Sequence, residues 1–186
     1  MRKRSIAGRA LGVVALVLGV AATGAEAKPR FGLGVGVLVP TLVMVDDAQP
    51  EASPGPLLVM SFDAEIATEA DAGLFLHVAS FGAETRAEQV NLFDVGLAAH
   101  WIALRDARTT LRLGGGLGYR RLFADAARYD ATQGIAVDLD ATLGHRVVAR
   151  LVLEVRVGAT AQPWGRNAQA TVILAPMPYF TVGAVF

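Results

Sequence analysis

Residues Met177–Phe186 read MPYFTVGAVF, and the chain ends on the aromatic Phe186. Side chains point to alternate faces of a β-strand. One face of this stretch is therefore apolar and the other is mostly small or polar: Phe180, Val182, Ala184 and Phe186 against Tyr179, Thr181, Gly183 and Val185. We expect this terminal strand to close a sheet by pairing with a strand from elsewhere in the chain.

Seven earlier segments alternate in the same way: Phe31–Val39, Leu58–Ala67, Leu74–Phe81, Leu92–Ala103, Leu111–Arg121, Gly134–Leu143 and Arg150–Ala159. Each is long enough to cross a bilayer as a tilted strand, and longer than the strands typical of globular proteins. Mean hydropathy is +0.44. The pattern predicts an all-β fold, an eight-stranded antiparallel up-and-down transmembrane β-barrel.

The two faces of these segments differ in charge. Within the membrane-spanning stretches, the apolar face is free of charged residues, and the other carries ten: Asp63, Glu65, Asp94, Arg112, Arg120, Asp138, Asp140, Arg150, Glu154 and Arg156. Buried charges are too costly to leave unpaired, and the interior of eight strands is just wide enough for side chains to fill. We predict a lumen plugged by ion pairs, with His77 and His100 also inside and Arg112, Asp140 and Arg150 brought together. A gated aqueous path is the alternative.

The connections alternate between short and long. Thr68–Gly73, Leu104–Thr110 and Gly144–Ala149 are the short ones, and Thr41–Leu57, Gly82–Asn91, Leu122–Gln133 and Thr160–Pro176 are the long ones. Short turns on one side and longer loops on the other are typical of outer-membrane barrels. We expect both termini to be periplasmic and the four longer loops to be extracellular.

The N-terminus has the pattern of a secretory signal peptide. A basic start and an apolar run, Leu11–Ala22, precede Ala25-Glu26-Ala27, which predicts cleavage after Ala27 and a barrel domain over residues 28–186. The remaining chain would hold 13 Lys and Arg against 16 Asp and Glu. That balance gives no reason to expect nucleic acid as a partner, and the absence of cysteine excludes disulfides.

Aromatic and basic residues mark the expected membrane rims. Phe31, Trp101 and Phe186 would lie at the periplasmic rim, and Phe93, Tyr119 and Phe180 toward the outer one. Arginines can hold phosphate with two hydrogen bonds. Arg121, Arg128 and Arg166 are therefore candidate contacts for lipopolysaccharide, the alternative being ordinary rim charge.

On these features the chain resembles the small outer-membrane β-barrel proteins of Gram-negative bacteria, the OmpA/OmpX-like eight-stranded class. The resemblance rests on the signal pattern, the eight alternating segments, the alternating connections and the C-terminal strand ending at Phe186. It implies an outer-membrane location, and recognition of the C-terminal strand by the barrel-assembly machinery. The peptidoglycan-binding domain of OmpA itself is lacking, so a cell-wall tether is not implied.

We predict a non-enzymatic protein with a structural or surface-interaction role, without cofactor or metal. It is expected to be a monomer, with outer-membrane lipid and lipopolysaccharide as its surroundings and no extracellular partner identifiable. The runner-up is a channel or carrier for hydrophobic or small solutes, as in OmpW-like barrels. Six lumen glycines favour it by leaving room, although arginines could also lie across them: Gly32, Gly34, Gly36, Gly114, Gly116 and Gly118. A lipid A-modifying enzyme is a remote alternative, because Ser53, Ser61 and Ser80 lie in no serine–histidine motif.

Overall fold

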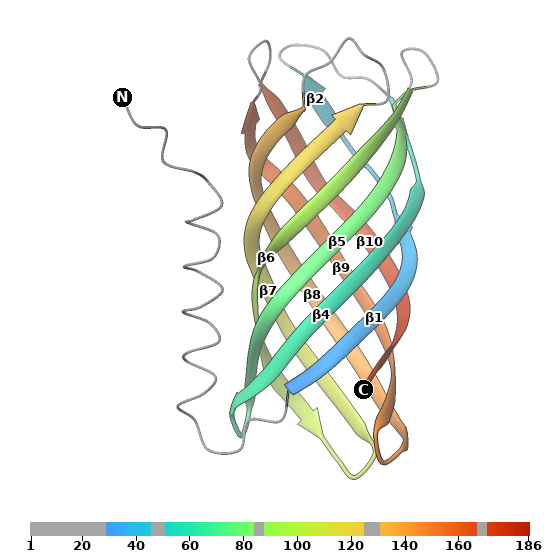
Figure 1. Ribbon diagram of the computed structural model, residues 1–186, viewed down its shortest axis with the longest axis vertical. Coiled ribbons are helices and arrows are strands. Elements are labelled where there is room, and N and C mark those ends of the chain that lie inside the picture. The colour runs from blue at the N-terminus through green and yellow to red at the C-terminus, as the bar shows by residue number, and fades with distance from the viewer. Residues whose placement is uncertain (1–28, 46–50, 84–87, 125–130, 167–170) are drawn as a thin grey trace, which may run out of the picture.

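A computed structural model describes residues 29–45, 51–83, 88–124, 131–166 and 171–186, which form one antiparallel sheet (Figure 1). The described residues contain ten strands: β1 (Pro29–Leu38), β2 (Val43–Val45), β3 (Ala52–Ser53), β4 (Gly55–Ala67), β5 (Ala70–Ala83), β6 (Glu88–Arg105), β7 (Thr109–Ala124), β8 (Thr132–Val148), β9 (Leu151–Arg166) and β10 (Val172–Val185). The predicted signal peptide, residues 1–27, lies outside them and stays a prediction.

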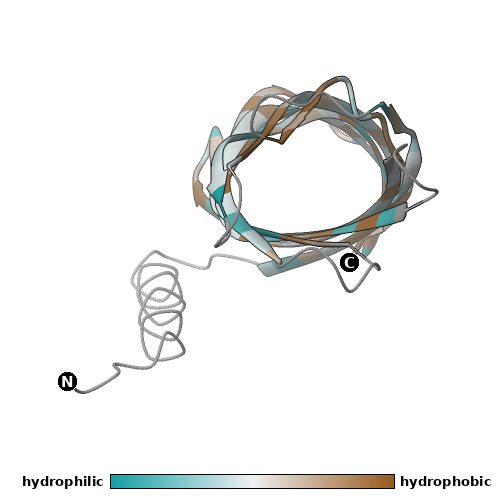
Figure 2. Ribbon diagram, turned by 90° about the horizontal axis from the view of Figure 1, so that it is seen from above, coloured by the Kyte–Doolittle hydropathy of each residue, from teal (hydrophilic) through white to brown (hydrophobic). Residues whose placement is uncertain are grey.

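The sheet closes into a ring of eight long strands. Each long strand pairs with its neighbours in chain order, and β10 returns to pair with β1 from Gly32 opposite Val185 to Leu38 opposite Tyr179. Beyond that register, Phe31 and Phe186 exchange two backbone hydrogen bonds of 3.2 and 2.9 Å. Viewed from one end, the strands enclose a complete ring (Figure 2). The predicted eight-stranded barrel, closed by its first and last strands, is confirmed.

The barrel has a turn end and a loop end. At the turn end, residues 68–69, 106–108 and 149–150 join successive strands. At the loop end the connections are residues 39–54, 84–87, 125–131 and 167–171, the first of which contains β2 and β3. The strands are longer than predicted, as in β6 with 18 residues. The prediction was too short because the alternation of apolar and polar residues stops at the edge of the apolar outer surface, whereas the backbone hydrogen bonds between strands continue past that edge.

The prolines of β10 coincide with an irregularity. The register between β10 and β9 shifts between Leu174 and Met177, around Pro176, which has no N–H to donate. On the other side of β10, β2 resumes the line of β1 and pairs with residues 172–174. The ladder with β9 thus resumes at Met177, two residues before the predicted start at Tyr179.

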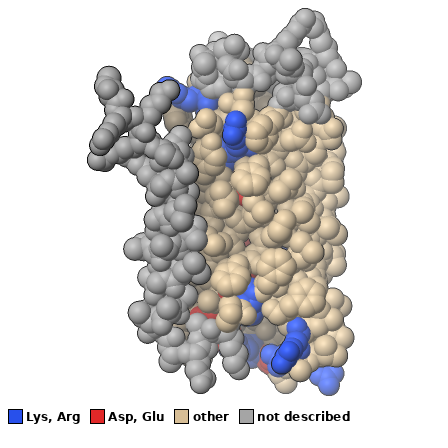
Figure 3. Space-filling model, viewed as in Figure 1, with Lys and Arg blue, Asp and Glu red and all other residues tan. Residues whose placement is uncertain are grey.

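The outer face of the ring is apolar. Every long strand exposes hydrophobic side chains there, and the middle of the face in Figure 3 shows almost no charge, with basic groups toward both ends. No helix among the described residues is long and apolar enough to cross a membrane. The inner faces carry the buried polar groups, and they define the candidate site.

Candidate functional site: the closed interior of the barrel

The centre of the lumen holds a buried ion pair. Asp94 on β6 and Arg120 on β7 are cross-strand partners, and both are fully buried. Arg120 donates from Nε to Asp94 Oδ1 at 2.6 Å and from Nη2 to Asp94 Oδ2 at 2.5 Å. The same Nη2 donates to Thr160 Oγ1 on β9 at 2.5 Å. This fork geometry is the strongest form of an Arg–carboxylate contact. The bond to Thr160 in addition joins β7 to β9, which are not neighbours in the sheet.

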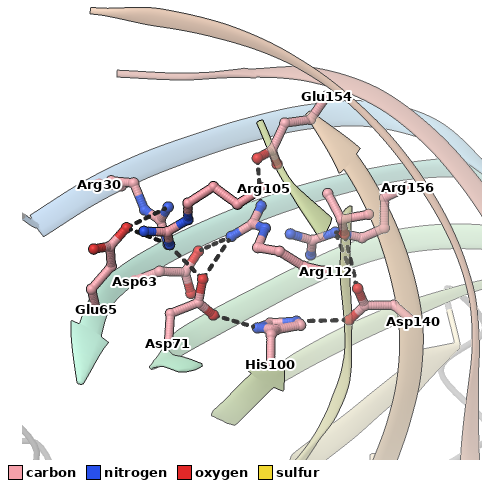
Figure 4. A network of polar contacts seen from close by, with 11 residues as sticks. Arg30, Asp63, Glu65, Asp71, His100, Arg105, Arg112, Asp140, Glu154 and Arg156 are labelled. Carbon is pink, nitrogen blue, oxygen red and sulfur yellow. Dashed lines mark hydrogen bonds and ion pairs between the residues drawn. The ribbon is translucent and has the colours of Figure 1, made fainter. Parts of the chain in front are cut away.

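A histidine bridges two carboxylates below this pair, toward the turn end (Figure 4). His100 Nδ1 lies 3.1 Å from Asp71 Oδ1, and His100 Nε2 lies 3.1 Å from Asp140 Oδ2. Ionised carboxylates only accept hydrogen bonds, so an imidazole that serves both of them carries a proton on each nitrogen. The bridge spans from β5 through β6 to β8.

Arg112 and Arg30 extend this bridge into a larger cluster. Arg112 lies 3.4 Å from Asp71 and 3.6 Å from Asp63, and its Nη2 donates to Glu154. Arg30 Nη2 donates to Asp71 Oδ2 at 2.5 Å. Two further groups complete this cluster, which we call the turn-end network. Glu65 and Arg105 pair at 2.9 Å. Arg156 Nε donates to Thr142 Oγ1 at 3.1 Å and lies 3.9 Å from Asp140 Oδ1.

The turn-end network is balanced in charge. It contains five carboxylates, from Asp63, Glu65, Asp71, Asp140 and Glu154, and four arginines, Arg30, Arg105, Arg112 and Arg156. With the doubly bonded His100 as imidazolium, the two signs are equal. A neutral, mutually paired set of charges can lie in a closed lumen without a net charge to solvate.

His77 on β5 is the cross-strand partner of Asp94, and it is buried and makes no hydrogen bond to a described residue. Its Nδ1 is 3.9 Å from the nearest carboxylate oxygen of Asp94 and of Asp138. Asp138 accepts a 2.9 Å hydrogen bond from the Tyr179 hydroxyl. The His77 ring packs against Phe75, at 4.9 Å between centroids, and against Tyr179, at 5.7 Å. These rings mark the boundary between the charged and apolar parts of the lumen.

The loop end of the lumen is filled by an apolar cluster that our prediction of a charged plug did not include. Its buried members are Leu38, Val43, Leu57, Val59, Ala79, Phe81, Leu92, Leu122, Val172, Leu174, Met177 and Tyr179. The interior of a membrane barrel is usually polar. Here several of the largest members are almost completely buried, so this loop-end cluster caps the ion-paired half.

Lumen glycines accommodate rings. A Cβ at Gly116 would lie 2.7 Å from Phe75 Cε1, and one at Gly158 would lie 2.5 Å from Tyr179 Cζ. At Gly114 a Cβ would meet the Ala99 carbonyl oxygen and the His100 ring. These glycines leave the space that the rings occupy, and it is rings, not arginines, that lie across Gly114 and Gly116.

Nine of the ten charged residues predicted for the lumen lie in it or at its turn-end mouth. Arg150 does not: it is exposed in the turn at residues 149–150, so that prediction was wrong. The strand begins one residue later than we expected, at Leu151. Arg112 and Asp140 belong to one network without Arg150, but they are linked only through Asp71 and His100. Arg156 lies in the lumen, as we predicted for that residue.

Four titratable participants were not predicted as site residues: Arg30, Asp71, Arg105 and Tyr179. Asp71 and Arg105 fell in stretches expected to be turns, and Arg30 fell before the first expected strand. Inward parity, continued past the predicted strand ends, could have found Arg30 and Asp71, and Tyr179 already lay on the inward face of the last predicted strand. Arg105 has outward parity by simple alternation, and the register shift between Ile102 and Leu104 in β6 changes it. Among the described residues, no group of three or more acidic or histidine side chains is arranged to hold a metal ion.

The residues predicted for the rims lie on the outer face. Phe31, Trp101 and Phe186 are exposed at the turn end, and Phe93, Tyr119 and Phe180 are exposed nearer the loop end. Arg121 and Arg166 are exposed near the loop end on β7 and β9, and each lies opposite Gln133 of β8. The Arg121 guanidinium lies 4.8 Å from the Phe123 ring centroid. Arg128 is outside the described residues.

No protein-family model and no curated protein sequence matches the chain. Solved structures do match. Neisserial surface protein A has a TM-score of 0.62 at 10% identity, over 86% of this chain and 97% of that one. The outer membrane protein OprG from Pseudomonas aeruginosa has a TM-score of 0.61 at 11% identity, over 88% and 98%. Ail, the attachment invasion locus protein of Yersinia pestis, in complex with the heparin analogue sucrose octasulfate, has a TM-score of 0.50 at 10% identity, over 86% and 99%.

With the closed ring described above, these matches define the class. The chain has the fold of the small eight-stranded outer-membrane β-barrels. At such low identities the likeness extends to the fold alone.

Proposed function

We propose that the protein is a non-enzymatic barrel of the bacterial outer membrane, with a closed, structural interior and a surface-interaction role carried by its outer rim and loop end. The observation that carries this proposal is the doubly closed lumen. Apolar side chains fill the loop end, and a charge-balanced network of ion pairs fills the turn end. We infer that these two layers together leave no continuous aqueous path.

The outer rim is the proposed place of lipopolysaccharide contact. Arg121 on β7 and Arg166 on β9 lie on either side of Gln133 on β8, and both are exposed near the loop end. Strands are about 4.8 Å apart, so the two side chains can hold phosphates about 10 Å apart. Binding of the sulfated sugar named for Ail is consistent with anion recognition by barrels of this fold. Lipopolysaccharide copurification should fall several-fold in R121Q/R166Q, and retention at the normal level would refute this role.

The non-enzymatic assignment is supported by the surroundings of the lumen histidines. His100 is bonded to two carboxylates, and His77 lies among aromatic rings and acids. Neither imidazole is hydrogen-bonded to a serine of the described chain. A purified barrel that released acyl chains from lipid A would contradict this assignment.

A hydrophobic-solute carrier is the second candidate, and one observation favours it: the loop-end half of the lumen is apolar. Against it stands the packing of that half, where Leu38 and Met177 have no exposed surface. Binding of a brominated fatty acid, read by tryptophan quenching and competed by unlabelled fatty acid, tests the two. Saturable binding that Leu38→Trp abolishes would support the carrier; no saturable binding supports the closed interior.

Orientation and assembly complete the proposal. The first strand, β1, begins at the turn end and the last, β10, ends there, where Phe31 and Phe186 pair. We propose that this end faces the periplasm, that residues 1–27 are a cleaved signal peptide, that the C-terminal strand engages the barrel-assembly machinery, and that the barrel is a monomer. Cysteine labelling of intact cells at the loop end tests the orientation, and labelling at the turn end instead would reverse it.

A further inference from the structure

The turn end carries a cluster of cationic side chains that the closed interior does not use. Arg108 and Arg150 lie in two turns at this end, residues 106–108 and 149–150, and Arg146 lies in the last residues of β8; all three are exposed. A 2.7 Å hydrogen bond from the Arg146 backbone N–H to the Arg108 carbonyl joins the end of β8 to the turn at residues 106–108. None of the three guanidiniums forms an ion pair with a described residue, in contrast to Arg105, which pairs with Glu65. We name these three arginines the turn-end patch.

Nearby acids neutralise the turn-end patch only in part. Asp106 lies in the same pair of turns, where it accepts backbone hydrogen bonds from residues 108 and 109 at 2.7 and 2.8 Å. Glu69 lies in the neighbouring turn and is exposed. The three arginines of the patch and the single carboxylate of the two turns, Asp106, together carry a net charge of +2.

The surroundings of the turn-end patch are apolar. Leu104, Val147 and Val148 are each at least half exposed and border the patch in sequence. Exposed aliphatic side chains at the end of the barrel wall, with arginines directly beyond them, are the arrangement expected at the boundary between hydrocarbon and headgroups. Phosphate is the anion at that depth, and guanidinium holds it with paired hydrogen bonds.

We propose that Arg108, Arg146 and Arg150 form a binding surface for the phosphate groups of anionic phospholipid, which gathers such lipid around one sector of the turn end. The inference rests on the proposed membrane location. An attraction of about fivefold per arginine is expected for charges at an anionic membrane surface, and added salt should weaken it.

The chain's two tryptophans allow a direct test, because Trp101 lies at the turn end and Trp164 near the loop end. In a W164F background, Trp101 fluorescence is measured in phosphatidylcholine vesicles that contain brominated phosphatidylglycerol or, for comparison, brominated phosphatidylcholine. The expected result is severalfold stronger quenching by the anionic lipid. In R108Q/R146Q/R150Q the two lipids should quench equally.

A W101F background supplies the control. Trp164 then reports the loop end, and its quenching should be unchanged in R108Q/R146Q/R150Q. Equal quenching of Trp101 by both lipids in the unsubstituted patch, or a preference that survives the triple substitution, would overturn the inference. So would a triple variant that loses only cosedimentation with peptidoglycan, because the partner would then be that polymer. If no brominated lipid quenches either tryptophan, the membrane location itself fails.

Discussion

Replacing Asp94 with alanine should strongly destabilise the barrel. Asp94 and Arg120 are both completely buried, and two hydrogen bonds of 2.6 and 2.5 Å join them. After the substitution, Arg120 keeps only its bond to Thr160 and remains a buried cation. Removing one partner of a buried pair costs about 3–5 kcal/mol, and we expect a loss of that size in the free energy of unfolding.

The assay is reversible urea unfolding of the barrel in lipid vesicles, with a double-mutant cycle. D94A/R120M removes both charges and should recover most of the lost stability, because no unpaired ion remains. The matched control is R105A, whose pair with Glu65 is about 40% exposed on each side and should be worth at most about 1 kcal/mol. If D94A cost no more than R105A, or if D94A/R120M were no more stable than D94A, the ion-pair reasoning would be refuted.

Three further outcomes follow from the structure. Gly116→Ala should lower the free energy of unfolding by about 1–3 kcal/mol, because the new Cβ would lie 2.7 Å from the Phe75 ring. Gly34→Ala is the control in the same assay: its Cβ would lie 3.4 Å from the nearest atom, on Thr181, and should have little effect. The Asp106 carboxyl has a lowered pKa because it accepts hydrogen bonds from two backbone N–H groups of the turn. Its contribution to the stability of the turn is therefore present above its ordinary pKa of 3.8 and is lost as the pH falls below that value. An NMR titration in which the two bonded amides show no change on the acid side would contradict this. Deleting Phe186 removes the last pairing of the closing strand and should reduce insertion, and normal levels in the outer-membrane fraction would contradict that expectation.

The inward residues of most strands could be predicted from periodicity alone. In β6, Phe93 and Trp101 face outward while Asp94 and His100 face inward, as alternation requires. The same reasoning failed at Arg150, which has the correct parity but lies in the turn before β9. Parity assigns a face only while the strand lasts, and strand ends depend on pairing partners that a single sequence does not reveal.

The loop-end cluster was missed for another reason. Leu38, Leu92 and Leu122 have inward parity, but the expectation that a barrel lumen is polar drew attention to the charges instead. The contacts of Arg30 and Arg105 could not be predicted either. They join residues about 40 positions apart across the lumen, as in the pairs Arg30–Asp71 and Arg105–Glu65. Which side chains meet there depends on the cross-section and stagger of the closed ring.

Single-channel recording from the purified, folded barrel in planar bilayers tests the closed lumen most directly. The packed loop-end cluster and the neutral turn-end network predict a silent barrel, without steady open currents, in the unsubstituted protein. D94A, which leaves a buried charge unpaired, provides the comparison and should show at least transient openings. Steady open currents from the unsubstituted protein would contradict the closed interior on which the proposed function rests.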